Sequence, residues 1–274
     1  MVPQLPIPSA AGDRFSVCEH VVRLGDIAQD VAAAVEAGAR GFSVNASDLG
    51  SFSVAEAADV LTDAGLAVTS FIDPSVMRLG PAAPDLDAVA RAADAAAELG
   101  APAILFISGA LGGRRVADAD AQLVDSLGAI AARIAPSGVH AMLEPLHPIA
   151  RDLSYVHTMR HAVALVEQVP SARLVIDTGA SWWEPTLVDE VVAHLDLVVA
   201  VQITGVRGAD LAKRTYVREA CSTDGEVPVG DIARDLVAAG YSGWFEHEVL
   251  APFDRDERVE VLRADRQWFA GLWS

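Results

Sequence analysis

The 274-residue chain has few of the residues that mark disulfide-rich, nucleic-acid-binding or membrane proteins. Its two cysteines, Cys18 and Cys221, lie far apart and without metal-ligand spacing, so we expect neither a disulfide framework nor a zinc knuckle, and predict a reducing cytoplasm. Basic residues are scarce, because 20 Lys and Arg stand against 38 Asp and Glu, for a formal net charge of −18. Nucleic acids and anionic membranes select basic surfaces, so neither is an expected partner.

Long uncharged runs are also missing. The longest, residues 99–113, is interrupted by Gly and Pro, and spanning a bilayer takes about 20 apolar residues. Residues 1–15 have neither the basic region nor the apolar core of a signal peptide. Because 52% of the residues are hydrophobic, the chain can bury a large core. We therefore expect a soluble protein with one domain over residues 1–274.

The chain does have a regular alternation of apolar, strand-like segments and Ala-rich, helix-like segments. Predicted strands cover residues 14–19, 41–46, 67–72, 102–108, 139–144, 173–178, 197–203 and 243–249. Predicted helices cover residues 26–37, 53–64, 84–98, 116–134, 154–168, 186–194, 229–239 and 255–270. Eight such repeats predict a single (β/α)8 barrel, the TIM-barrel architecture. The alternative, an open doubly wound sheet, needs a Gly-rich phosphate turn after the first strand, and CEHVVRLGD (18–26) has none.

Polar side chains with oxygen ligands stand at the ends of four consecutive predicted strands, where barrels of this kind carry their active sites. They are Glu144, Asp177, Gln202 and Glu248. Burying three carboxylates together is unfavourable unless a cation neutralises them, so the four predict a divalent-metal site. Oxygen donors favour a hard cation, with Mn²⁺ as the preferred candidate and Mg²⁺ or Co²⁺ as alternatives. Taken singly, each residue could instead cap a helix, bond a loop or form a salt bridge.

Three further groups follow the same strand ends. His147 could act as a general acid or base, or be a loop histidine held by its flanking prolines. Arg207 could bind an anionic or hydroxyl-rich substrate, or be a surface charge. Trp182 and Trp183 could form an apolar wall over a sugar face, although such pairs also serve packing. Glu246 shares the inward parity of Glu248 but lies deeper, which indicates a role in a core network.

Five segments of the second half carry a family resemblance: LEPLHP (143–148), VIDTGASWWEP (175–185), VQITGVR (201–207), DGEVPVGDI (224–232) and AGYSGWFEHEVL (239–250). Together they resemble the sugar phosphate isomerase/epimerase group of xylose-isomerase-like TIM barrels. Relatives in that group include hydroxypyruvate isomerase, inosose dehydratase and the ketohexose 3-epimerases. The last segment is the most specific, because it matches the family's Gly-Tyr-x-Gly followed by an apolar strand that ends in Glu.

The resemblance implies a metal-dependent enzyme that acts on a small carbohydrate. Glu144, Asp177, Gln202 and Glu248 match the family's four divalent-metal positions. In isomerase and epimerase members the first and last carboxylates also move a proton at the carbon beside a carbonyl, which gives Glu144 and Glu248 a second expected role. A metal that bridges the carbonyl and the adjacent hydroxyl stabilises the enediolate of such a reaction.

Two positions depart from the family pattern and leave alternatives open. Ala180 stands where members commonly have His three residues after the metal Asp, and Thr204-Gly205 stands where an Asp is common. One alternative is a lyase or dehydratase on a keto-sugar or 3-oxo-glycoside, of the C-glycoside-cleaving type, with His147 as base. Another is a non-catalytic barrel that serves as a binding or partner subunit. A homo-oligomer is compatible with either.

Overall fold

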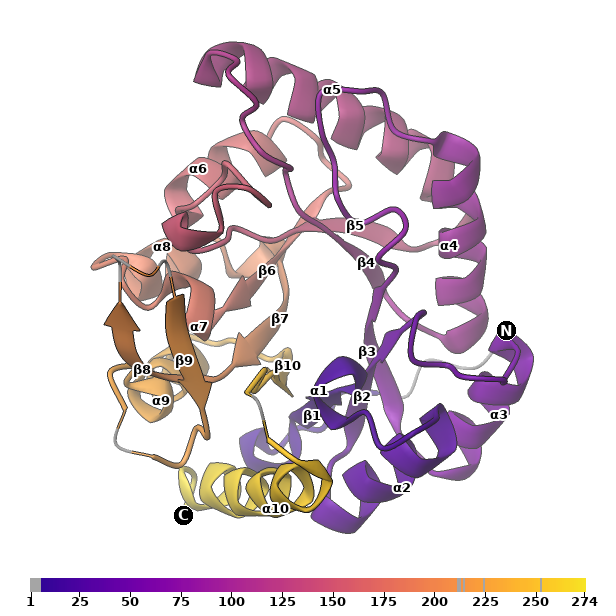
Figure 1. Ribbon diagram of the computed structural model, residues 1–274, viewed down its shortest axis with the longest axis vertical. Coiled ribbons are helices and arrows are strands. Elements are labelled where there is room, and N and C mark those ends of the chain that lie inside the picture. Colours follow the sequence, from indigo (N-terminus) through magenta and orange to yellow (C-terminus); the bar gives the residue numbers. More distant parts are fainter. Residues whose placement is uncertain (1–5, 211–212, 214, 224, 252) are drawn as a thin grey trace.

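Eight parallel strands close into a barrel, and helices cover its outside (Figure 1). The computed structural model describes residues 6–210, 213, 215–223, 225–251 and 253–274. The barrel strands are β1 (Phe15–Cys18), β2 (Gly41–Asn45), β3 (Ala67–Ile72), β4 (Ala103–Phe106), β5 (His140–Leu143), β6 (Arg173–Asp177), β7 (Val198–Ile203) and β10 (Trp244–His247). Closure comes from β10, which pairs with β1 on one side and β7 on the other. The predicted (β/α)8 barrel is confirmed.

The longer helices of the outer layer lie close to their predicted positions. They are α2 (Ile27–Ala37), α3 (Val54–Asp63), α4 (Leu86–Leu99), α5 (Val116–Ile134), α6 (Met159–Val166), α8 (Leu187–Ala193), α9 (Val229–Ala238) and α10 (Arg255–Gly271). Local chemistry sets several ends: Ser53 and Glu56 form a capping box at the start of α3, and Gly100 ends α4 with a φ of 84°. Two short helices, α1 (Glu19–Val22) and α7 (Thr178–Ser181), directly follow β1 and β6.

The structure adds an element that the sequence analysis did not predict. Strands β8 (Gly205–Asp210) and β9 (Thr215–Glu219) form an antiparallel hairpin beyond the end of β7. In Figure 1 this hairpin stands over the rim of the barrel, apart from the closed ring of strands. Its strands belong to neither a strand–helix repeat nor the helical layer, which is why a search for eight repeats passes over them.

A second difference concerns α6, which begins later than the predicted helix over 154–168. The Oγ of Ser108, beyond β4, accepts hydrogen bonds from the backbone N–H groups of Tyr155 (2.9 Å) and Val156 (3.2 Å). These bonds hold the segment in an extended form. The helix then starts after Thr158, whose side chain accepts a hydrogen bond from the N–H of His161.

The interior of the barrel has an apolar half and a polar half. The apolar half is a cluster of buried side chains mainly from β3 to β7: Ile72, Ala103, Leu105, Ile107, Met142, Val175 and Ala200. The polar half centres on Glu246 of β10, which accepts hydrogen bonds from Thr69 (2.6 Å) and Ser70 (2.8 Å) of β3. Glu246 thus lies in a buried hydrogen-bond network below the rim.

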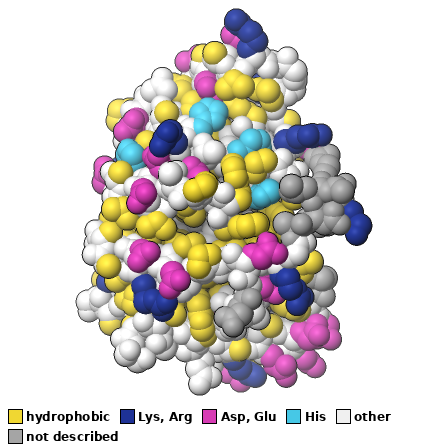
Figure 2. Space-filling model, turned by 90° about the vertical axis from the view of Figure 1, so that its left-hand side faces the viewer, with side chains coloured by type: hydrophobic (Ala, Val, Ile, Leu, Met, Phe, Trp, Pro, Cys, Tyr) yellow, Lys and Arg dark blue, Asp and Glu magenta, His cyan; other side chains and the backbone are white. Residues whose placement is uncertain are grey.

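The surface carries charges of both signs without a basic patch on the face that Figure 2 displays. On this face, which includes α6, α8 and the hairpin, Lys and Arg side chains stand singly among acidic and apolar ones (Figure 2). Among the described residues, none of the helices is both long enough and apolar enough to cross a membrane.

Candidate functional site

Three buried carboxylates meet at the C-terminal rim of the barrel. Glu144 follows β5, Asp177 ends β6 and Glu248 follows β10, and one carboxylate oxygen from each lies within 4.8 Å of the other two. Gln202 of β7 pairs in register with Asp177 and is fully buried. Neither atom of its side-chain amide has a hydrogen-bond partner among the described residues. The four residues named from the sequence as metal ligands therefore come from neighbouring strands at one rim.

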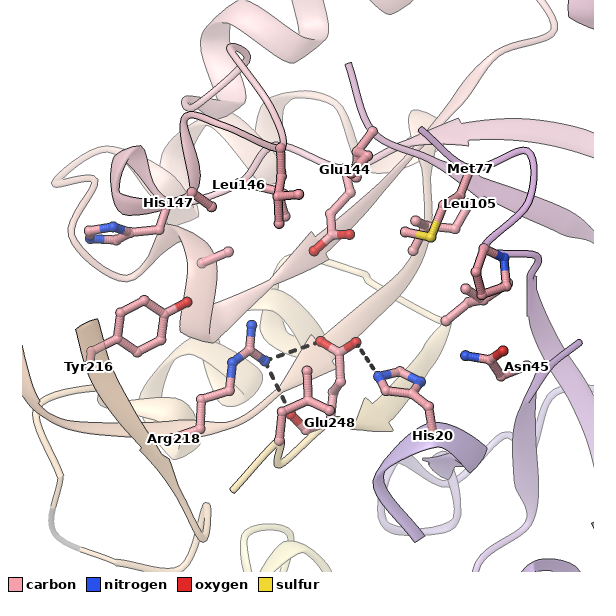
Figure 3. A pocket seen from close by; sticks show the side chains of 17 residues that line it. His20, Asn45, Met77, Leu105, Glu144, Leu146, His147, Tyr216, Arg218 and Glu248 are labelled. Carbon is pink, nitrogen blue, oxygen red and sulfur yellow. Dashed lines mark hydrogen bonds and ion pairs between the residues drawn. The ribbon is translucent and has the colours of Figure 1, made fainter. Parts of the chain in front are cut away.

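An arginine that the sequence analysis did not single out lies among these carboxylates (Figure 3). The guanidinium of Arg218, on β9, donates to Asp177 Oδ2 at 2.5 Å and to Glu248 Oε2 at 3.2 Å. It also donates to the backbone carbonyl of Glu248 at 3.1 Å. On the other side, Nε2 of His20 lies 3.0 Å from Glu248 Oε1. Glu248 is therefore held between two nitrogen groups.

The end of β9 is anchored, which keeps Arg218 in place. Asp265 of α10 accepts hydrogen bonds from the backbone N–H groups of Cys221 (2.8 Å) and Ser222 (2.9 Å). The same carboxylate lies 2.9 Å from Nε2 of His247 on β10. The carboxylate of Asp265 is buried, so its hydrogen bonds join the hairpin, the barrel and the last helix without competition from water.

Burial and neighbouring charges push the pKa values of the three carboxyls apart. Burial raises the pKa of Glu144 well above its usual range, and the charges of Glu248 and Asp177 raise it further. Burial also raises the pKa of Asp177, to about 6, although Arg218 opposes this effect. For Glu248 burial acts in the same direction, but the hydrogen bond from His20 and the charge of Arg218 outweigh it and lower the pKa.

The donor set fits a divalent cation. Glu144, Asp177 and Glu248 form a group that could hold a metal ion, and the buried oxygen of Gln202 lacks a hydrogen donor among the described residues. When all three carboxyls are ionised, the one guanidinium of Arg218 leaves two negative charges, which a divalent cation would balance. Oxygen donors of this kind suit hard cations.

His147 is held by an aromatic cluster and by its own backbone. Its ring lies 6.3 Å from that of Trp182, 5.7 Å from that of Trp183 and 5.4 Å from that of Tyr216, between ring centroids. Nδ1 accepts a hydrogen bond from the N–H of Ile149 at 3.0 Å. In the neutral imidazole the proton must therefore lie on Nε2. Burial, followed by the nearby His157, lowers the pKa of His147 and favours this neutral form.

A cavity of about 380 Å³ opens onto the carboxylates. Its lining residues are His20, Asn45, Ile72, Pro74, Met77, Leu105, Ile107, Glu144, Leu146, His147, Ala150, Leu153, Ala180, Tyr216, Arg218, Glu248 and Leu250. Asp177 and Gln202 lie beneath it, both with no exposed surface. Ala180, which stands in place of the family histidine, contributes a methyl group to the lining of the cavity.

The remaining candidates lie outside the cavity lining. Trp182 and Trp183 pack around His147 instead of forming a wall of their own, and Nε1 of Trp183 donates to the carbonyl of Ala180 at 2.9 Å. The side chain of Arg207 is 72% exposed and pairs with Glu219. The two tryptophans therefore contact His147 from outside the lining, and the side chain of Arg207 is largely exposed on the hairpin.

A buried carboxyl at the end of β1 leads to a prediction about stability. Burial raises the pKa of Glu19 from 4.5 to about 8, and the folded chain therefore holds a proton that the unfolded chain has lost between these values. Its free energy of unfolding should fall as the pH rises through this window, by about 1.4 kcal/mol per pH unit for one group. Glu19→Gln removes this pH dependence. The free energy of unfolding of the variant, relative to that of the wild type, should therefore increase from pH 5 to pH 8.

Urea unfolding of both proteins across this pH range measures the difference. The amide oxygen of the Glu19→Gln variant can still accept the hydrogen bond that Glu19 receives from the backbone N–H of Asn45. Glu98→Gln, at an exposed position on α4, serves as the control, and its free energy of unfolding should change with pH as that of the wild type does. Parallel curves for Glu19→Gln as well would contradict the raised pKa.

Comparison with solved structures shows the same fold in several proteins. A protein from Sinorhizobium meliloti 1021 superposes with a TM-score of 0.80, at 23% identity, over 94% of this chain and 98% of its own. The 3-keto-D-glucoside 4-epimerase of E. coli gives a TM-score of 0.74, at 18% identity, over 93% and 98%. The IolI protein, whose structure holds a zinc atom, gives 0.79, at 14% identity, over 95% and 99%. Identities this low show a shared fold.

The sequence itself was compared with curated proteins and with family models. None of the curated proteins matches it significantly. The family model for the xylose isomerase-like TIM barrel matches residues 31–272. Since this match covers most of the chain, and both the closed barrel and the superposed structures agree with it, the chain belongs to the xylose isomerase-like TIM-barrel family.

Proposed function

We propose that the chain is a divalent-metal-dependent isomerase or epimerase that acts on a sugar or keto-sugar by moving a proton at the carbon beside a carbonyl. The observation that carries the proposal is the meeting of Glu144, Asp177 and Glu248 at one rim, next to the buried Gln202 that pairs in register with Asp177. A cavity large enough for a small molecule opens onto two of these carboxylates. The fold shared with a 3-keto-D-glucoside 4-epimerase supports the same reaction class.

Glu144, Asp177, Gln202 and Glu248 would hold the cation. A cation bound there would supply positive charge that stabilises the negative charge developing on the substrate oxygens. Mn²⁺ is the cation proposed, with Mg²⁺ or Co²⁺ as alternatives, because the four donors are oxygens.

Glu144 and Glu248 are the proposed proton carriers. Both line the cavity, and they come from strands on different sides of it, β5 and β10. In Figure 3 the two carboxyl groups point towards the same space from above and below. A substrate held in that space presents opposite faces of one carbon to the two carboxylates. One carboxylate, in its ionised form, can remove a proton from one face and keep it, while the other, in its protonated form, delivers its own proton to the opposite face, which inverts the carbon.

Three side chains of the cavity would bind the substrate oxygens. Arg218 brings a guanidinium beside the carboxylates, where it can stabilise negative charge that develops on an oxygen. His147, which the sequence suggested as a general acid or base, has its proton on Nε2 and can donate a hydrogen bond, so we propose it as a donor. Tyr216 lies beside His147 and adds a phenol to the same side. Trp182 and Trp183 would position His147.

The reaction can be tested with keto-sugars and Mn²⁺ in heavy water. Recovery of an epimer or isomer that carries deuterium at the carbon beside the carbonyl supports the proposal. Release of a leaving group, without return of deuterium to the recovered sugar, would instead support the lyase or dehydratase. If neither product forms while the metal content is verified, the proposal fails and the alternative of a non-catalytic binding subunit gains support.

Removal of the cation should lower thermal stability. A ligand that binds only the folded state contributes about 2.7 kcal/mol when its free concentration is 100 times its Kd. For a chain of this length that amounts to a melting temperature several degrees lower in excess chelator. Differential scanning calorimetry before and after chelation, with elemental analysis of each sample, gives the comparison. Unchanged melting after verified removal of a bound metal would count against the site.

A further inference from the structure

One half of the cavity is lined by a continuous apolar surface, which we call the apolar wall. Its residues are Ile72, Met77, Leu105, Ile107 and Leu153, from β3, β4 and the loops after β3, β4 and β5. In Figure 3, Met77 and Leu105 lie on the side of the cavity opposite His147 and Tyr216, with the carboxyl group of Glu144 between the two sides. The polar side chains of His147 and Tyr216 therefore lie on one side, beside the apolar Leu146, and the apolar wall lies on the other.

The apolar wall is fixed by backbone hydrogen bonds. The N–H of Ile107 donates to the carbonyl of Met77 at 2.8 Å, and the N–H of Leu79 donates to the carbonyl of Ile107 at 2.9 Å. Gly109 packs so closely on this segment that a Cβ there would lie 1.8 Å from the carbonyl oxygen of Leu79. A further bridge joins Gly109 to Ser154. Because these loops are tied together, the wall is formed before any ligand arrives, which reduces the entropy cost of binding.

The mouth of the cavity leaves two large apolar side chains in water. Leu153 is 44% exposed and Leu250 is 46% exposed, and both line the cavity. A ligand that covers them would remove apolar surface from water, at about 25 cal/mol per Å². Exposed apolar side chains that continue a buried apolar wall are a typical feature of a binding site for a partly apolar molecule.

A bare sugar is a poor match for this half of the cavity. A sugar carries hydroxyl groups around its whole ring, and each one that loses water without gaining a hydrogen bond costs free energy. The side chains of the apolar wall offer no strong donor or acceptor. Asn45, which Figure 3 places below the wall, accepts hydrogen bonds from Ser47 through its side-chain oxygen, so it offers a ligand only its amide N–H groups. The sugar-like part of a substrate is therefore better matched to the side of Arg218, Tyr216 and His147.

From these observations we infer that the substrate is a keto-sugar that carries an apolar substituent, such as an aryl or alkyl group, and that this substituent rests on the apolar wall. The inference rests on the proposed function for the position of the reacting carbon, near Glu144 and Glu248. The apolar wall itself stands independently of that reaction. The volume of about 380 Å³ lies within the range of about 300–1,000 Å³ typical of pockets that hold drug-sized ligands.

The test compares two ligands with the same reacting groups, methyl and phenyl 3-keto-glucoside. Their dissociation constants are measured by titration calorimetry with Mn²⁺ present, and turnover is measured separately by deuterium exchange. We expect the phenyl compound to bind at least about tenfold more tightly, since filling an apolar pocket by even one methylene changes affinity about 10- to 200-fold. Equal dissociation constants, or binding of neither compound, would overturn the inference.

Variants then locate the preference in the cavity. Met77→Gln and Leu153→Gln keep similar volumes but place an amide on the apolar wall, so each should reduce the phenyl-to-methyl ratio. Val35→Thr, at a 45% exposed position on α2 outside the cavity, is the control and should leave the ratio unchanged. Circular dichroism and melting curves verify that each variant is folded. A ratio that neither wall variant changes would also overturn the inference.

The two proposals can fail separately. A phenyl preference that the wall variants reduce, without deuterium exchange on either ligand, would support the apolar wall and reject the proposed reaction. Exchange on both ligands with equal dissociation constants would support the reaction and reject the apolar wall as a substrate subsite.

Discussion

Glu144→Gln and Glu248→Gln are each expected to lower kcat for epimerisation or isomerisation about 10²- to 10⁴-fold, the usual contribution of a positioned general acid or base. Glutamine has nearly the shape of glutamate but cannot carry the proton, and it weakens the set of oxygen donors for the cation. Both residues are 6% exposed and line the cavity, so the loss should come from their role in the reaction and not from a change in structure elsewhere. Steady-state kinetics on the active keto-sugar provide the measurement.

A matched control is available in Glu184, which is 7% exposed but outside the cavity lining. Its carboxylate accepts a hydrogen bond from the N–H of Met159 at 2.8 Å, at the start of α6. Glu184→Gln retains an acceptor oxygen and should keep kcat within a few fold. Wild-type rates in Glu144→Gln and Glu248→Gln would reject both residues as proton carriers.

Arg218→Met is expected to lower the free energy of unfolding, and the loss should be largest when no divalent cation is present. It leaves Asp177 and Glu248 buried without their cationic partner, and breaking a buried ion pair in this way costs about 3–5 kcal/mol. A bound cation supplies the missing charge, so the loss should shrink when Mn²⁺ is added. Urea unfolding in chelator and in Mn²⁺ measures both quantities.

Arg207→Met is the natural control, because it removes an arginine from the same hairpin. The side chain of Arg207 is 72% exposed, and an exposed pair of this kind contributes about 0–1 kcal/mol. Equal losses for the two variants would contradict the largely enclosed position of the Arg218 side chain, which is 12% exposed. A loss at Arg218 that Mn²⁺ does not reduce would argue against a cation among these carboxylates.

The contrast between these two arginines also explains what the sequence could predict and what it could not. Strand ends such as Glu144 and Asp177 are recognisable because an apolar run stops at a carboxylate, and a closed barrel brings all such ends to one rim. The hairpin has no such run. In its register Arg218 stands opposite Val206, which is fully buried, while Arg207 stands opposite Val217, which is 44% exposed. A shift of one residue in pairing would exchange the two faces, and this register depends on tertiary contacts.

The tryptophans illustrate a similar limit. Asp177 accepts a hydrogen bond from the N–H of Gly179 at 2.8 Å, which starts the short helix α7 directly after β6. This helical turn directs Ala180 into the cavity and carries Trp182 and Trp183 behind His147. The sequence indicated that two aromatic rings follow the strand, but a single turn of helix determines which side chain faces the cavity.

Because of the hairpin, the spacing of the proposed cation ligands and the positive charge beside them are set by different parts of the structure. The strands that supply or precede Glu144, Asp177, Gln202 and Glu248 are each paired on both sides, so their spacing is set by the whole ring. Arg218 instead belongs to a two-stranded element outside that ring. Replacement of this hairpin could therefore change the charge at the rim while the eight strands of the barrel keep their pairing. Related chains can in this way diverge in chemistry, and a designer can graft a different hairpin, without rebuilding the barrel.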